Sequence, residues 1–163
     1  MSKVLIIKKE LLTDANILFL AMKPKDVAEA LTPFKEYINN NVLIISLLAG
    51  VSTDSIRKLL QKDVPIIRAM PNTSAAILKS ATAISPSKHA TAEHIRTATS
   101  LFETIGLVSV VEEEDMHAVT ALSGSGPAYI YYVVEAMEEA AKKNRFKRRC
   151  CKITYSSNDD WCC

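Results

Sequence analysis

Short continuous apolar runs alternate along the chain with segments that carry apolar residues at helical spacing. The runs cover residues 16–22, 42–48, 66–70, 81–84 and 107–111. Uninterrupted hydrophobicity over a few residues is typical of strands that are buried on both faces. Strands that alternate with helices need crossover connections, and these produce a mostly parallel sheet. The sequence therefore predicts an α/β fold, the carboxyl half of a doubly wound parallel sheet.

The segments between the runs carry helix start signals. Pro24 lies near a first turn, where a missing N–H group costs nothing, and Ser52 or Thr53 can cap the next helix. A further helix is expected from about Thr91. The acidic residues 112–115 suit the positive end of a helix dipole, so a helix should begin there and reach the glycine break at residues 123–127.

A second helical stripe follows the glycine break, with no further strand. Its apolar residues are Ile130, Val133, Val134, Met137 and Ala141. Three parts are therefore expected: an α/β domain over residues 1–111, the start of an all-helical domain over 112–143, and a tail over 144–163 without hydrophobic period.

Composition argues against several classes of protein. The net charge is only +2, and much of the excess lies in residues 142–152, so the body has no basic surface for nucleic acid. No segment offers eighteen apolar residues in a row, and the N-terminus does not resemble a signal peptide, so a cytoplasmic location is expected. All four cysteines follow residue 149 as adjacent pairs, and the three histidines are not grouped, so no metal site is expected.

Polar or irregular residues follow three of the predicted strands. They are Ala21 to Pro24, then Leu48-Ala49-Gly50, and then Met70-Pro71-Asn72-Thr73. In open α/β sheets ligands bind outside the carboxyl ends of the strands, so these turns should border one site. Two simpler interpretations remain: Lys23-Pro24 only ends a strand, and Asn72 is only a turn residue.

The stretch Ser123-Gly124-Ser125-Gly126 has the composition of a phosphate-binding loop. It follows a predicted helix instead of a strand and lacks a Gly-Lys-Ser/Thr ending, which argues against a Walker-type loop. Close helix packing, in which glycine lets two backbones approach, is the stronger interpretation.

Four motifs in series resemble the pyrroline-5-carboxylate reductase family. They are ILFLAMKPKDV, ISLLAGVS, IRAMPNTSAAI and AVTALSGSGPAYIYYVVEAM, and the resemblance runs from about Leu11 to Lys143. It implies a Rossmann-like domain that binds NADP or NAD, followed by a helical dimerisation domain, and thus a homo-oligomer. It also implies reduction of the cyclic imine 1-pyrroline-5-carboxylate to L-proline by hydride transfer.

The resemblance also implies positions for the site residues. Ala21, Met22, Lys23 and Pro24 would line the dinucleotide together with Leu47, Leu48 and Ala49, and Asn72 would lie near the nicotinamide and the imine. The substrate pocket would be bordered by Ser123, Gly124, Ser125, Gly126, Pro127 and Ala128. No catalytic residue is named, because the serine- and threonine-rich loop from which the family takes its proton donor is absent.

Two departures from the family pattern set the remaining expectations. None of the four glycines forms the GxGxxA turn that holds the pyrophosphate, so the chain is expected to be truncated at its N-terminus. Residues 144–163 can be back-translated with synonymous codons so that reading one nucleotide later gives IGLKEDVAKSLILQTMIGAA, a continuation of the family type. The tail is therefore expected to be out of frame.

Three functions are compatible with the sequence. The first is a pyrroline-5-carboxylate reductase fragment whose activity as an isolated chain is doubtful, with the choice between NADH and NADPH unsettled. The second is a noncatalytic remnant that associates through its helical segment. The third is another NAD(P)-dependent imine or hydroxy-acid dehydrogenase.

Overall fold

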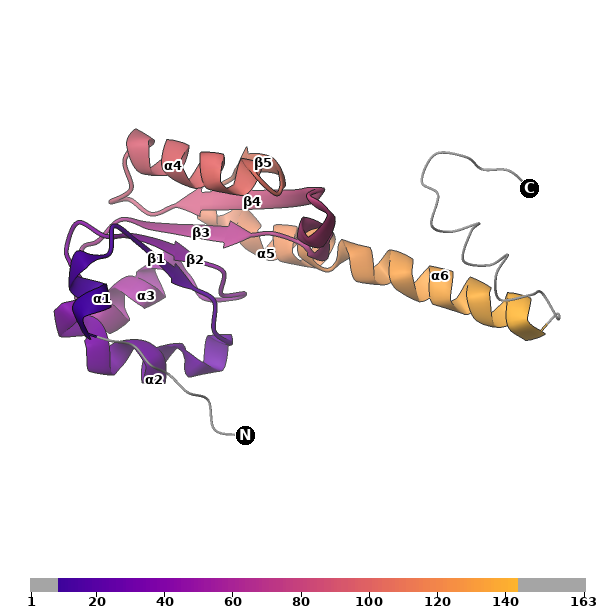
Figure 1. Cartoon of the computed structure of the whole chain (residues 1–163), viewed down its shortest axis with the longest axis horizontal. Coiled ribbons are helices and arrows are strands. Elements are labelled where there is room, and N and C mark those ends of the chain that lie inside the picture. Colours follow the sequence, from indigo (N-terminus) through magenta and orange to yellow (C-terminus); the bar gives the residue numbers. More distant parts are fainter. Residues whose placement is uncertain (1–8, 144–163) are drawn as a thin grey trace. The chain divides into compact units, whose positions relative to one another are not determined.

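A five-stranded sheet forms the centre of the first part of the chain. The computed structural model describes residues 9–143, with side chains from Leu12 onward (Figure 1). The strands are β1 (Ile17–Leu20), β2 (Leu43–Ser46), β3 (Ile66–Met70), β4 (Ser80–Pro86) and β5 (Gly106–Val110), and they lie in this order across the sheet. Every predicted apolar run therefore overlaps a strand, and the predicted α/β class is confirmed.

The sheet is parallel except between β3 and β4. The β1–β2, β2–β3 and β4–β5 pairs are parallel, whereas β3 and β4 run in opposite directions. The connection between β3 and β4 covers only residues 71–79 and contains a 3₁₀ helix, η3 (Thr73–Ile77). A parallel crossover needs about a dozen residues or more, so this connection can only return the chain as a neighbouring antiparallel strand.

The helices begin close to their predicted starts. α3 (Thr53–Leu60) is capped by the hydroxyl oxygen of Ser52, which accepts a hydrogen bond from the Ser55 N–H group at 3.1 Å. α4 (Ala92–Glu103) is capped by Thr91. The helix expected after Pro24 is short: α2 (Val27–Leu31) lies between the 3₁₀ turns η1 (Pro24–Asp26) and η2 (Thr32–Tyr37). Pro33 supplies no N–H group, and this explains the end of the α-helix.

Helices cover both faces of the sheet, as Figure 1 shows with α4 on one side and α2 and α3 on the other. Strand residues alternate between the two sides, so each side has its own core. The first core contains Ile44, Ile66, Ile56 and Leu60, and the second contains Ile45, Ile67, Ala98 and Phe102. The short helix α1 (Lys9–Asp14) precedes β1.

A helical segment follows β5 and belongs to the same compact unit as the sheet. It consists of η4 (Glu113–Asp115), α5 (Met116–Val119) and η5 (Thr120–Gly124), a π-helix. Met116 is 1 % exposed, which shows that the segment is packed rather than free. The chain divides into two compact units after Gly124, and we define residues 113–124 as the anchor segment.

The second unit begins at Ser125. Its described part is α6 (Gly126–Lys143), which carries exposed apolar side chains. They are Tyr129, Ile130, Tyr131, Tyr132, Val133 and Met137. Among the described residues no helix combines the length and the apolar character needed to cross a membrane. The predicted out-of-frame tail, residues 144–163, lies outside the described residues and stays a prediction.

Candidate functional site

The turn after β1 places the first predicted group at the surface. Ala21, Lys23 and Pro24 are exposed, and Met22 is half-buried. The Lys23 carbonyl accepts a hydrogen bond from the Asp26 N–H group at 2.9 Å, which closes the turn into η1. The N–H groups of Met22 and Lys23 have no hydrogen-bond partner among the described residues. They are therefore available to a ligand at the carboxyl end of β1.

The turn after β2 lies beside the turn after β1. The Leu47 N–H group donates to the Leu20 carbonyl at 2.9 Å, which extends the ladder between these parallel strands. The Leu48 side chain is 2 % exposed and packs into the core. Only backbone atoms of Leu48 can therefore face a ligand. Ala49 is exposed, and its N–H group also lacks a partner in the described part of the chain.

Asn72 follows β3 and makes hydrogen bonds in two directions. Its Oδ1 atom accepts from the Ser74 N–H group at 3.2 Å, so Asn72 caps η3. Its Nδ2 atom donates to the Ser123 carbonyl oxygen at 3.3 Å. The turn-residue interpretation is therefore correct, but it is incomplete, because the same side chain links β3 to the end of the anchor segment.

Ser123 and Gly124 lie against the sheet in the same unit as the strand ends. The Ser123 hydroxyl donates to the Ala81 carbonyl oxygen at 3.3 Å. A Cβ atom built on Gly124 would lie 2.9 Å from the terminal methyl of Met70. A larger residue here would require the flexible end of the Met70 side chain to shift. The close neighbour is thus a β3 side chain and not the backbone of another helix.

The remaining residues of the predicted substrate loop belong to the second unit. The Ala128 N–H group donates to the Ser125 carbonyl at 3.0 Å in the first turn of α6. A Cβ atom on Gly126 would meet no other atom within 4 Å, so close packing does not explain this glycine in the described structure. The structure therefore brings Asn72 and Ser123 together, and it describes residues 125–128 separately.

Sequence reasoning missed an ion pair between the sheet and the anchor segment. Arg68 lies in the middle of β3, with its side chain 4 % exposed, and its Nη1 atom donates to Glu113 Oε1 at 2.5 Å. The other carboxylate oxygen of Glu113 is buried without a hydrogen-bond partner among the described residues. The available signal was a single arginine inside the otherwise apolar run of residues 66–70.

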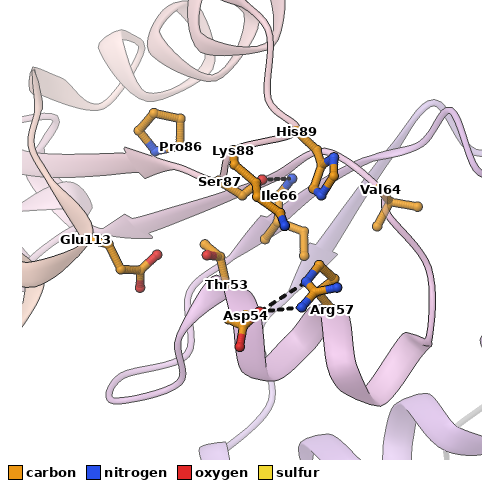
Figure 2. A pocket seen from close by; sticks show the side chains of 10 residues that line it. All are labelled: Thr53, Asp54, Arg57, Val64, Ile66, Pro86, Ser87, Lys88, His89 and Glu113. Atoms are coloured by element: carbon orange, nitrogen blue, oxygen red, sulfur yellow. Dashed lines mark hydrogen bonds and ion pairs between the residues drawn. The ribbon is translucent and has the colours of Figure 1, made fainter.

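A pocket of about 230 Å³ is lined by none of the predicted site residues (Figure 2). It is lined by Asp54 and Arg57 of α3, by Lys88 and His89 after β4, and by Glu113. Arg57 pairs with Asp54 at 2.7 Å and with Asp63 at 3.3 Å. Hydrogen bonds from Lys58 and then Arg57 lower the pKa of Asp54 from 3.8 to about 2. Most of the charged groups in this pocket thus already have partners.

The arrangement of the sheet, with helices on both faces and turns at the carboxyl ends of β1, β2 and β3, gives the chain a Rossmann-like fold. The family model for pyrroline-5-carboxylate reductase dimerisation matches residues 113–154, and thus continues past Lys143. Pyrroline-5-carboxylate reductase 2 of Bacillus subtilis is 48% identical over 136 residues, which cover 83% of this chain and 49% of the relative.

Two solved structures extend the comparison. A pyrroline-5-carboxylate reductase from Coxiella burnetii aligns with a TM-score of 0.79 and 29% identity, covering 93% of this chain and 62% of that one. The Plasmodium falciparum pyrroline carboxylate reductase with NADP bound gives a TM-score of 0.83 at 24% identity, with the same coverages, and this likeness concerns the fold. The chain belongs to the pyrroline-5-carboxylate reductase family. It spans about half the length of the curated relatives that it matches.

Proposed function

We propose that this chain carries part of the site that reduces 1-pyrroline-5-carboxylate to L-proline with NADPH or NADH. The observation that carries the proposal is the meeting of Asn72 with Ser123, because it joins a strand-end turn to the motif that the family uses at its substrate. Relatives that share 48% and 41% identity with this chain are named pyrroline-5-carboxylate reductases. The Plasmodium structure, which shares the fold, contains NADP.

The residues on this chain suit a task of positioning. The free N–H groups of Met22, Lys23 and Ala49 can donate hydrogen bonds to a dinucleotide without any side-chain specificity. The cofactor supplies the hydride, while the protein orients the reactants and excludes water. Ser123 is held beside the turn after β3 and against β4, and it would contact the substrate there together with Gly124.

The cofactor fits the described residues only in part. The strand-end turns offer exposed backbone donors, but none of the four glycines in the sequence forms the phosphate-binding turn. Each charge-assisted hydrogen bond that such a turn provides contributes about 1.5 to 3 kcal/mol. The described strand-end turns therefore provide only part of the hydrogen bonds that a dinucleotide needs, and we expect them to bind NADPH weakly.

Calorimetric titration of the purified chain with NADPH and with NADH, followed by assays with 1-pyrroline-5-carboxylate, tests the proposal. Weak but saturable binding and slow, substrate-dependent oxidation of the cofactor are expected. Asn72→Asp should lower both, whereas Glu114→Gln, which changes an exposed carboxylate, should lower neither. Absence of cofactor binding and of turnover at high concentrations would overturn the proposal and favour a noncatalytic chain.

The same proposal includes self-association through α6. The family model that matches residues 113–154 describes a dimerisation domain. The six exposed apolar side chains of α6 are the kind of surface that such an interface covers. A homo-oligomer is therefore part of the proposed function, with a second copy of the chain as the partner. The proposal also includes a cytoplasmic location.

A noncatalytic protein that associates through α6 is the second candidate, because this helix carries six exposed apolar side chains. Binding of NADPH by the chain separates the two candidates. The comparisons do not favour the third alternative, a different imine or hydroxy-acid dehydrogenase, since the curated relatives reported above are pyrroline-5-carboxylate reductases.

A further inference from the structure

Alternate residues of one strand hold both ends of the anchor segment. Arg68 pairs with Glu113, the first residue of the segment, at 2.5 Å. Two residues later, Met70 packs against Gly124, the last residue. After two more, Asn72 donates to the Ser123 carbonyl at 3.3 Å. Because side chains alternate along a strand, Arg68 and Met70 point to the same face of the sheet.

The lengths of the two elements are compatible with this double attachment. Four residues of extended chain separate Arg68 from Asn72, a distance of about 13 Å at 3.3 Å per residue. Ten residues separate Glu113 from Ser123, about 15 Å if they are helical. A segment of this length can lie beside β3 with its two ends at the two attachment points.

The first attachment is electrostatic and buried. Arg68 lies between Ser46 on β2 and Ser85 on β4 in the strand register, so no carboxylate faces it from the neighbouring strands. Glu113, 33% exposed, supplies the negative charge. In the described part of the chain, this is the only ion pair between the sheet and the anchor segment. A buried arginine without a counter-charge is strongly disfavoured, so the pair fixes where the segment begins.

We propose that Arg68 and Glu113 are positioning residues that set the place of Ser123 and Gly124 beside the strand ends. The pair acts through the helical turns between Glu113 and Ser123, and it touches neither cofactor nor substrate. This inference rests on the proposed function in one respect: the substrate that Ser123 and Gly124 would contact. The mechanical link between residue 113 and residues 120–124 exists whether or not the chain is active.

Amide hydrogen exchange on the full chain tests the link directly. Glu113→Gln keeps the size of the side chain but removes the charge that Arg68 requires. We expect exchange in residues 120–124 to become at least about tenfold faster, while exchange in α4 stays unchanged. Glu114→Gln is the matched control, because it makes the same chemical change on the neighbouring exposed residue, and it should alter neither segment.

A conservative variant separates positioning from a general loss of stability. Glu113→Asp keeps the negative charge and should restore most of the protection in residues 120–124. Faster exchange throughout the sheet in Glu113→Gln, or no change in residues 120–124, would overturn the inference. A chain that fails to bind NADPH but shows the local effect would contradict the proposed function and leave the positioning pair established.

Discussion

Asn72 reaches 51 residues along the chain to donate a hydrogen bond from its Nδ2 atom to the carbonyl oxygen of Ser123. The same side chain caps η3 through its Oδ1 atom, and the Asn72 N–H group donates to the Ser80 hydroxyl at 3.2 Å. Three segments of the first unit therefore meet at one asparagine. The local turn and the long-range link depend on different atoms of the amide, so substitution can separate them.

Asn72→Asp should remove the link to Ser123 and keep the cap on η3. Aspartate still accepts from the Ser74 N–H group, but it has no donor for the Ser123 carbonyl. We expect the free energy of unfolding to fall by about 1 kcal/mol, measured by urea denaturation. Asn41→Asp makes the same change at an exposed residue and should stay within about 0.5 kcal/mol of the wild type. Equal effects of the two variants would contradict a structural role for the Nδ2 atom.

Gly106→Ala should be the most damaging of the glycine substitutions. Gly106 begins β5 with φ at +150°, and a Cβ atom there would lie 2.0 Å from the Ser80 carbonyl oxygen. Backbone strain of about 1 to 3 kcal/mol and overpacking of similar size should add. Gly50→Ala is the matched control, because Gly50 also has a positive φ, +73°, but open space around it. Gly50→Ala should lower the free energy of unfolding by only about 1 to 2 kcal/mol. The thermal midpoints of the two variants check this, and similar midpoints would contradict the steric explanation.

The folded chain should lose stability in acid when Asp54 is protonated and its ion pairs are lost. The folded-state pKa of Asp54 is lowered from 3.8 to about 2, because Lys58 and Arg57 donate hydrogen bonds to its carboxylate. Stability from these contacts is fully present above pH 3.8 and is lost as the pH falls towards about 2. Asp54→Asn should lack this part of the acid dependence when thermal midpoints are measured across that window. Glu114→Gln should retain it, and an unchanged profile in Asp54→Asn would contradict the assignment.

Ile130→Glu should weaken self-association of the chain. Ile130 is 64% exposed on α6, in a stripe with Val133 and Met137, and a charge in a buried apolar interface is strongly unfavourable. We expect the dissociation constant of the oligomer to rise at least about tenfold in sedimentation experiments, which corresponds to about 1.4 kcal/mol. Glu135→Gln, on an exposed residue of the same helix, is the control. An unchanged constant in Ile130→Glu would place the interface elsewhere.

Much of the sheet could be predicted from the sequence, because buried strands require continuous apolar runs and helix starts require caps. Ser52, one of the two predicted caps, caps α3, and α4 begins directly after Thr91, where a helix was expected to start. The direction of β4 relative to β3 could not be deduced from hydrophobicity alone, because parallel and antiparallel strands can both have continuous apolar runs. The shortness of the connection at residues 71–79 is what indicates that β4 is antiparallel to β3.

The candidate site was harder to predict, because its decisive contacts join distant parts of the chain. Arg68 and Glu113 are 45 residues apart, and neither lies in a sequence motif that predicts the other as its partner. The sequence placed Asn72 and Ser123 in the same site by family resemblance. It could not show that they touch, because a contact between separated segments depends on how the folded elements pack.

Strand β2 gives two adjacent residues entirely different neighbours. Ile44 belongs to the core beneath α2 and α3, whereas Ile45 belongs to the core beneath α4. A protein engineer could therefore repack one side of the sheet without redesigning the other, and variants at residues 44 and 45 should be screened as separate libraries.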